Sequence, residues 1–141
     1  MVYLLDINAL IALCDNHHIH HEIAHRWFMR QNKPKWATCP LTENGFLRIL
    51  GNPNYPHYPG SPSVVLSMLQ TARSIVNHHF WPDSKSILEI VKPGILMHSS
   101  HITDIYLLGL AVANGGKLAT FDRKIPVQTV IGGEKAVEWM E

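Results

Sequence analysis

The sequence predicts an α/β fold, specifically a three-layer α/β/α sandwich around a central parallel β-sheet. Short apolar runs that suit buried strands alternate with helical segments along the chain, a pattern typical of parallel sheets covered by helices on both faces. The 141 residues, of which 46% are hydrophobic and 16% charged, have the size and composition of one globular domain with one core. We therefore expect residues 1–141 to form a single domain.

The first half of the chain is expected to contain two strands and three helices. Thr42 is the expected N-cap of the third helix, because a threonine hydroxyl accepts hydrogen bonds from the free N–H groups of a first helical turn. The second helix would turn its hydrophobic side chains toward the core, namely Ile19, Ile23, Trp27 and Phe28. The expected strands cover residues 2–5 and 36–40, and the expected helices cover residues 7–14, 17–30 and 41–50.

The second half opens with a loop at residues 52–62, which contains four prolines and a glycine. Thr103 is the expected N-cap of the most apolar helix, and Asn114-Gly115-Gly116 is its expected end, where a positive φ is needed. The expected helices cover residues 63–76, 83–91, 104–113 and 134–140, and the expected strands cover residues 79–81, 118–121 and 127–131.

Four acidic residues lie where a parallel sheet builds its sites. Asp6 and Asp122 directly follow expected strands, whereas Glu43 and Asp104 lie in the first turns of helices that start at the same edge. A helix of about 11 residues rises roughly 16 Å, and the following strand returns about the same distance. Asp104 and Asp122 should therefore be neighbours. Because sites of parallel sheets lie outside the carboxyl ends of the strands, we expect all four acids in one crevice there.

Four neighbouring carboxylates need a cation. Two of them about 5 Å apart repel each other by roughly 3 kcal/mol at an effective dielectric constant near 20. A site made only of oxygen ligands favours Mg²⁺ or Mn²⁺, and these ions keep bound waters and contact phosphate oxygens. This chemistry suits hydrolysis of a phosphodiester by a metal-activated water, with the Asn8 amide contacting the ion's waters or Asp6.

The segments that carry these acids resemble those of the PIN-domain ribonucleases, and in particular the VapC-type toxins of VapBC toxin–antitoxin pairs. The matching segments are Leu4–Asn8, Thr42–Arg48, Phe80–Asp83, Ile102–Asp104 with its apolar helix, and Leu118–Arg123. The resemblance implies an endoribonuclease, dependent on Mg²⁺ or Mn²⁺, that cuts structured RNA such as tRNA or a ribosomal RNA loop. It further implies a homodimer and a cognate antitoxin that covers the acidic crevice.

By the same resemblance, Asp6, Glu43, Asp104 and Asp122 are the catalytic and metal-binding residues, with Asn8, Thr103 and Thr120 in support. The candidates for binding RNA phosphates are four basic residues, Arg26, Arg48, Arg123 and Lys124. Each of the four has a plainer interpretation as a solubilising surface residue or as a partner for antitoxin acids. Arg48 would alternatively neutralise Glu43.

Two other functions are compatible with the sequence. His21-Glu22-Ile23-Ala24-His25 matches the HExxH pattern of zinc hydrolases, in which two histidines bind zinc and the glutamate acts as base. The plainer interpretation is a solvated face of the second helix, because no third ligand or cleft is apparent downstream. The other alternative is a non-catalytic module that binds nucleic acid or protein and retains the fold.

Charge and cysteine content limit the setting of the protein. A formal net charge of +1 excludes binding of nucleic acid by a broadly cationic surface. Cys14 and Cys39 lie in apolar stretches and are expected to be free thiols in a reducing compartment. No signal peptide and no run of the roughly 20 apolar residues that a membrane span needs is apparent. We therefore expect a cytoplasmic protein without a membrane segment.

Overall fold

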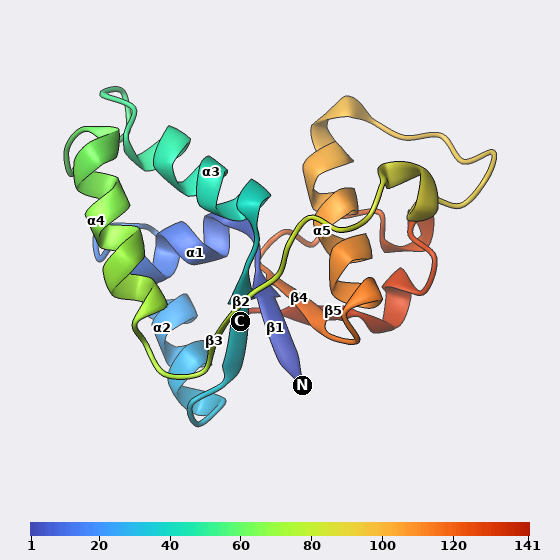
Figure 1. The fold of residues 1–141 in the computed structure, drawn as a ribbon, viewed down its shortest axis with the longest axis horizontal. Helices are drawn as coiled ribbons and strands as arrows, with labels where there is room; N and C mark the ends of the chain where they lie inside the picture. The colour runs from blue at the N-terminus through green and yellow to red at the C-terminus, as the bar shows by residue number, and fades with distance from the viewer.

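A computed structural model describes residues 1–141, and a five-stranded sheet lies at its centre (Figure 1). All neighbouring strands are parallel and follow the order β3-β2-β1-β4-β5. Helices cover both faces, so the predicted α/β/α sandwich is confirmed. The strands are β1 (Val2–Leu5), β2 (Lys35–Thr38), β3 (His78–Phe80), β4 (Lys117–Thr120) and β5 (Val137–Trp139).

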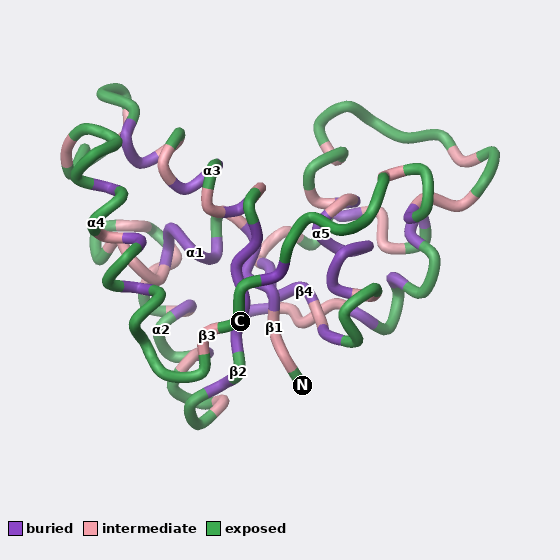
Figure 2. The backbone as a smooth tube through the Cα atoms, in the orientation of Figure 1, coloured by how far each residue is buried: buried purple, intermediate pink, exposed green.

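The two faces of the sheet bury different sets of helices. Helices α1 to α4 pack on one side and α5 on the other, as Figure 1 shows. Successive residues of the central strand point to opposite faces, so Leu5 joins the first cluster and Leu4 the second. Figure 2 shows the resulting band of buried chain through the middle of the molecule. The helices are α1 (Ile7–Cys14), α2 (His21–Arg30), α3 (Pro40–Leu50), α4 (Pro62–Arg73) and α5 (Ile102–Ala113).

Two glycines shape connections at opposite edges of the sheet, Gly45 at the carboxyl edge and Gly115 at the edge where β4 begins. A Cβ on Gly45 would lie 2.5 Å from Ile7 Cδ1, so only glycine lets α3 pack this closely against the start of α1. Gly115 has a φ of +68°, and the N–H of Gly116 bonds to the carbonyl of Ala111, which ends α5 as predicted. The chain then turns directly into β4.

Three predicted helix starts are wrong by one to four residues. The N-cap of α3 is Cys39 rather than Thr42, whose hydroxyl donates to the Cys39 carbonyl and accepts from the Cys39 N–H inside the first turn. Thr103 is the second residue of α5, because a 3-10 turn at Ser99–His101 leads into the helix. Helix α2 begins at His21 instead of residue 17. Ile19 therefore precedes α2 and is 86% exposed rather than part of the core.

The chain after residue 82 departs most from the prediction. The expected helix at 83–91 is a single 3-10 turn, Ile87–Glu89. The expected strand at 127–131 is also a 3-10 turn followed by one antiparallel bridge, Val130 to Val91. The expected terminal helix contains β5, which pairs with β4. This pairing satisfies backbone groups of β4 that would otherwise be unpaired at a sheet edge.

The apolar helices of this chain are all short. None combines the length and the hydropathy that crossing a membrane would require.

Candidate active site

Asp6 lies where β1 ends and α1 begins. Its backbone is extended, and its Oδ1 accepts a 2.7 Å hydrogen bond from the N–H of Ala9, so the side chain caps α1. Only 4% of the residue is exposed. The strand–turn–helix connection therefore fixes this carboxylate at the carboxyl edge of the central strand.

Thr120, the last residue of β4, joins Asp6 to Asp122. Its buried hydroxyl donates a 2.5 Å hydrogen bond to Asp6 Oδ2 and accepts one of 3.0 Å from the backbone N–H of Asp122. Asp122 Oδ1 accepts a 2.8 Å hydrogen bond from the backbone N–H of Lys124. Because β1 and β4 are neighbouring parallel strands, the two acids that follow them meet at one edge.

Asp104 lies in the first turn of α5, across the sheet from α1, and is partly buried. Burial raises the pKa of this carboxyl, and the charge of Asp122 raises it further. Burial also raises the pKa of Asp6 to about 7, and Asp104 and Asp122 add to the rise. Hydrogen bonds from Thr120 and Ala9 work in the opposite direction. The three aspartates thus share one electrostatic neighbourhood.

Glu43 has different partners. Thr38 Oγ1 donates a 2.6 Å hydrogen bond to Glu43 Oε2, and Arg73 Nη1 lies 3.3 Å from the same oxygen. The guanidinium of Arg73 also lies over the ring of Phe80, 5.1 Å from its centroid. Arg73, and not Arg48, is therefore the residue that neutralises Glu43. Glu43 is not among the groups that raise the pKa of Asp6 or Asp104.

The partners of Glu43 extend onto the edge strand β3. The Thr38 hydroxyl lies 2.8 Å from His78 Nε2. Burial, and then the charge of Arg73, lower the pKa of His78 to about 4, so this imidazole is neutral at pH 7. A neutral His78 with its proton on Nε2 can donate to Thr38, which leaves the threonine proton for Glu43.

The crevice contains no ready-made cage for a metal ion. No three side chains among the histidines, cysteines, aspartates and glutamates lie close enough together to hold one. The expected convergence of four acids is thus incomplete, with Glu43 bound to Arg73. The three aspartates nevertheless suit a hydrated ion, because Mg²⁺ keeps several waters and takes only one or two carboxylates. A cation would also stabilise the charged forms of the buried Asp6 and the partly buried Asp104, whose pKa values are raised.

A cavity of about 390 Å³ opens beside Asp6 and Asp122. The residues that complete its lining come from the start of α1, the segment between α1 and α2, and the end of β4; they are Asn8, His18, Ile19, His20 and Phe121. Asn8 faces this space without a hydrogen bond to Asp6. The cavity thus joins carboxylates on one wall to aromatic and aliphatic side chains on another.

The supporting and basic candidates are dispersed. Thr120 is buried between two aspartates, whereas Thr103 is exposed. Arg123 is bound to the C-terminal residue Glu141, with Nη2 at 2.6 Å from Oε2, and lies over the ring of Trp139. The other three basic candidates, Arg26, Arg48 and Lys124, are exposed and form no ion pair.

The HExxH segment does not form a zinc site. His21 Nδ1 lies 2.7 Å from the carbonyl oxygen of Ala12, so this ring bonds to the last turn of α1. The rings of His21 and His25 are 6.0 Å apart, Glu22 is exposed, and no third ligand completes a metal-holding group. The contact of His21 with Ala12 instead holds the start of α2 against the end of α1.

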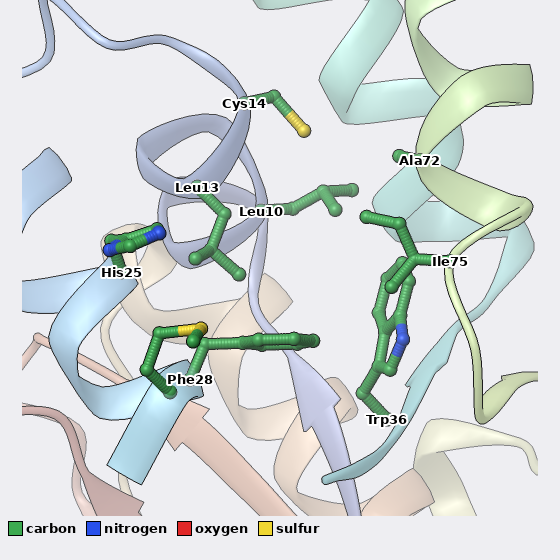
Figure 3. A pocket seen from close by; sticks show the side chains of 9 residues that line it. Leu10, Leu13, Cys14, His25, Phe28, Trp36, Ala72 and Ile75 are labelled. Carbon is green, nitrogen blue, oxygen red and sulfur yellow. The ribbon is translucent and has the colours of Figure 1, made fainter. Parts of the chain in front are cut away.

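A second cavity, of about 240 Å³, lies between α1, α2, β2 and α4 (Figure 3). Figure 3 shows Leu10, Phe28 and Trp36 pointing into it, with His25 at one side and Cys14 at another. Burial raises the pKa of the Cys14 thiol to about 11, so it is not a reactive thiolate at neutral pH. An almost wholly apolar lining without an acid or a nucleophile cannot perform hydrolysis.

Several residues of the crevice were not singled out from the sequence. Thr38 and Arg73 hold Glu43 but have no local motif, since their roles come from the pairing of β2 with β3 and from the end of α4. His18 and His20 belong to a visible histidine cluster, but a helix expected over residues 17–30 would contain both of them. Only knowledge that α2 begins at His21 would have placed them in the loop beside Asp6.

Known proteins with similar sequences include proteins named as ribonucleases. The profile described as PIN domain matches residues 3–128. Ribonuclease VapC44 of Mycobacterium tuberculosis is 40% identical over 134 residues, which is 94% of each chain. Ribonuclease VapC39 of the same organism is 38% identical over 86% of this chain and 89% of its own.

Solved structures agree on the fold. Mycobacterium tuberculosis VapC20, a sarcin–ricin loop cleaving toxin, aligns with a TM-score of 0.64 and 12% identity over 92% of this chain and 96% of its own. VapBC2 from Rickettsia felis, bound to a promoter DNA fragment, aligns with a TM-score of 0.63 and 14% identity over the whole of both chains. With a profile match over nearly all of its length and relatives named Ribonuclease VapC, the chain belongs to the PIN-domain family.

Proposed function

We propose that this chain is a metal-dependent endoribonuclease, the toxin of a VapBC-type toxin–antitoxin pair. Its substrate would be structured RNA, such as a tRNA or ribosomal RNA loop. The observation that carries the proposal is the crevice at the carboxyl edge of β1 and β4. There, the charges of Asp104 and Asp122 raise the pKa of Asp6, and the charge of Asp122 raises the pKa of Asp104. The likeness to relatives named Ribonuclease VapC supports the same activity.

The chain's own residues can orient and accept a proton. Asp6 is held by the N–H of Ala9 and the hydroxyl of Thr120, so its oxygens have fixed directions. Without a cation its pKa of about 7 leaves this carboxyl in both protonation states at neutral pH, and a bound cation would hold it in the charged, proton-accepting form. That property suits a group that takes a proton from an attacking water. Asp104 and Asp122 supply the neighbouring negative charge.

Asp6, Asp104 and Asp122 would hold a Mg²⁺ or Mn²⁺ ion, and Glu43 would join them if it left Arg73. Such an ion supplies positive charge for the phosphate oxygens and lowers the pKa of water. Glu43 is 3.3 Å from Arg73, so its participation requires a change of partner. The exposed side chains of Arg26, Arg48 and Lys124 are available for RNA phosphates.

The cognate antitoxin would act by covering this crevice. The similarity of the fold to VapBC2 from Rickettsia felis, solved with a promoter DNA fragment, supports a partner of this kind. We also propose that the protein forms a homodimer and acts in the cytoplasm.

Incubation of the purified protein with total RNA, with Mg²⁺, Mn²⁺ or EDTA, tests the activity. We expect discrete cleavage with either ion and none with EDTA, and sequencing of the new 5′ ends would identify the bond that is cut. Asp104→Asn should show no cleavage under any condition. If the unmutated protein binds RNA but does not cleave it with either ion, it is instead a non-catalytic binding module.

A further inference from the structure

We propose that the wall of the crevice formed by Ile19, His20 and Phe121 binds the unpaired base of a nucleotide that adjoins the scissile phosphate. The inference rests on the proposed ribonuclease function and names the part of the RNA that the crevice recognises. The wall and the acids line one cavity of about 390 Å³, a size within the range of about 300–1,000 Å³ typical of small-ligand sites.

The wall presents an aromatic surface. The rings of His20 and Phe121 are stacked, with centroids 4.8 Å apart and an interplanar angle of 25°. Phe121 follows β4 and packs against the core cluster of α1 to α4, and His20 is the N-cap of α2. Both rings are therefore anchored to regular elements, and unpaired bases bind such platforms by stacking.

Ile19 is the unusual member of the wall, because 86% of it is exposed although it is a large aliphatic residue. It precedes His20 and lies at the same cavity. An isoleucine so exposed beside this cavity gains by covering an apolar ring edge. A base stacked beside His20 would supply one.

The neighbouring His18 favours a base over a phosphate. Its Nδ1 accepts a 3.0 Å hydrogen bond from the N–H of His20, which requires an unprotonated nitrogen at that position. Burial, and next the charge of His20, also lower the pKa of His18. A neutral imidazole offers Nε2–H as a hydrogen-bond donor to a base and no positive charge to a phosphate.

Position ties the wall to the reacting group. Phe121 directly precedes Asp122, and Thr120 before it is bonded to Asp6. When a phosphate binds at the aspartates, the base of the nucleotide that carries it can therefore reach the wall. The wall would then select cut sites in loops, where bases are unpaired, over cut sites in helices.

The test uses a single-stranded oligoribonucleotide that spans the mapped cut site, together with two abasic versions that lack the base on either side of the cut. The protein variants are His20→Ala, His20→Phe, which retains an aromatic ring, and Phe121→Leu. His17→Ala is the matched control, because His17 stacks on His57 outside this cavity. Circular dichroism and melting temperature establish that each variant is folded.

We expect His20→Ala to raise KM by about 5- to 150-fold, the range of one base–aromatic stack, with kcat little changed. His20→Phe should restore KM, and His17→Ala should leave it unaltered. For the unmutated protein, removing one of the two bases should raise KM by the same factor. For His20→Ala, removing that base should leave KM almost unchanged. Equal losses in both proteins, or an unchanged KM for His20→Ala, would overturn the assignment.

Binding to the cleavage-deficient Asp104→Asn protein separates this inference from the proposed activity. Fluorescence anisotropy of the intact and abasic strands in EDTA should show weaker binding of one abasic strand, and no such difference after His20→Ala. If the unmutated protein cleaves RNA but Asp104→Asn binds the intact and abasic strands equally, the ribonuclease proposal stands and the base-binding wall is rejected. If Asp104→Asn prefers the intact strand but the unmutated protein cleaves no RNA, the base-binding wall stands and the ribonuclease proposal is rejected. If His20→Ala weakens only antitoxin binding, the wall serves a protein partner and the inference is wrong.

Discussion

Replacing Asp6 by asparagine should change how the stability of the metal-free protein depends on pH. In the folded chain, burial raises the pKa of Asp6 from 3.8 to about 7, so the folded state keeps a proton that the unfolded chain releases. The stability contributed by this proton is complete below about pH 4 and is lost as the pH rises through about 7. At 1.36 kcal/mol for each pKa unit, the loss is at most about 4 kcal/mol.

Asparagine at position 6 removes this titration while keeping an acceptor for the N–H of Ala9. Urea unfolding in EDTA, followed by tryptophan fluorescence, gives the free energy of unfolding of both proteins. At pH 5 Asp6→Asn should be more stable by only about 2 kcal/mol, because the unfolded chain has by then released most of its proton while folded Asp6 still holds its own. At pH 8.5 Asp6→Asn should be more stable by about 4 kcal/mol.

Subtraction of the two curves removes the contribution of the ten histidines, which both proteins share. A difference that stays constant from pH 5 to 8.5 would refute the reasoning, since Asp6 would then be ionised throughout. A difference that grows toward low pH would show that the pKa of Asp6 is lowered by its hydrogen bonds more than it is raised by burial.

Further changes near the crevice have distinct expected results. Asp104→Asn should abolish RNA cleavage while the melting temperature in EDTA stays equal or rises, because a repelling charge is lost; a large fall would contradict this. Thr120→Val removes the hydrogen bond that lowers the pKa of Asp6, so the carboxyl NMR titration of Asp6 should move upward from about 7. His21→Ala loses the 2.7 Å contact to the Ala12 carbonyl and about 1 kcal/mol of stability. Its RNA cleavage should persist, and a loss without unfolding would favour the zinc-hydrolase alternative. Millimolar Mg²⁺ should raise the melting temperature of the unmutated protein, and an unchanged value would count against a cation site.

The central fold was predictable because burial on both faces leaves a clear pattern in the sequence. The runs at β1, β2 and β4 are apolar, and the glycines after α5 mark its end. The edge strand β5 has only three residues, all partly buried, and owes its conformation to pairing with β4. The capping box of Ser86 and Glu89 is present, but it starts one turn rather than a helix. Local signals thus indicate that a helical turn forms nearby, without fixing the residue at which a helix begins or its length.

The candidate site was predictable to the extent that sheet topology determines it. Asp6 and Asp122 meet because they follow neighbouring parallel strands, as the strand pattern predicted. Glu43 was expected beside them, but Arg73, which is 30 residues away in sequence, holds its carboxylate. No periodicity or motif reveals which distant side chain will pair with an acid at a helix start. Such pairings follow from the packing of whole elements.

The most direct test of the central claim is to soak a crystal with Mn²⁺ and to locate the ion by its anomalous scattering. The crevice is predicted to hold the ion, with a carboxylate oxygen of Asp6 or Asp104 about 2–2.5 Å away and the signal absent in Asp6→Asn. An anomalous peak among the histidines between residues 17 and 25, with none beside the aspartates, would contradict the assignment of this crevice as the catalytic centre.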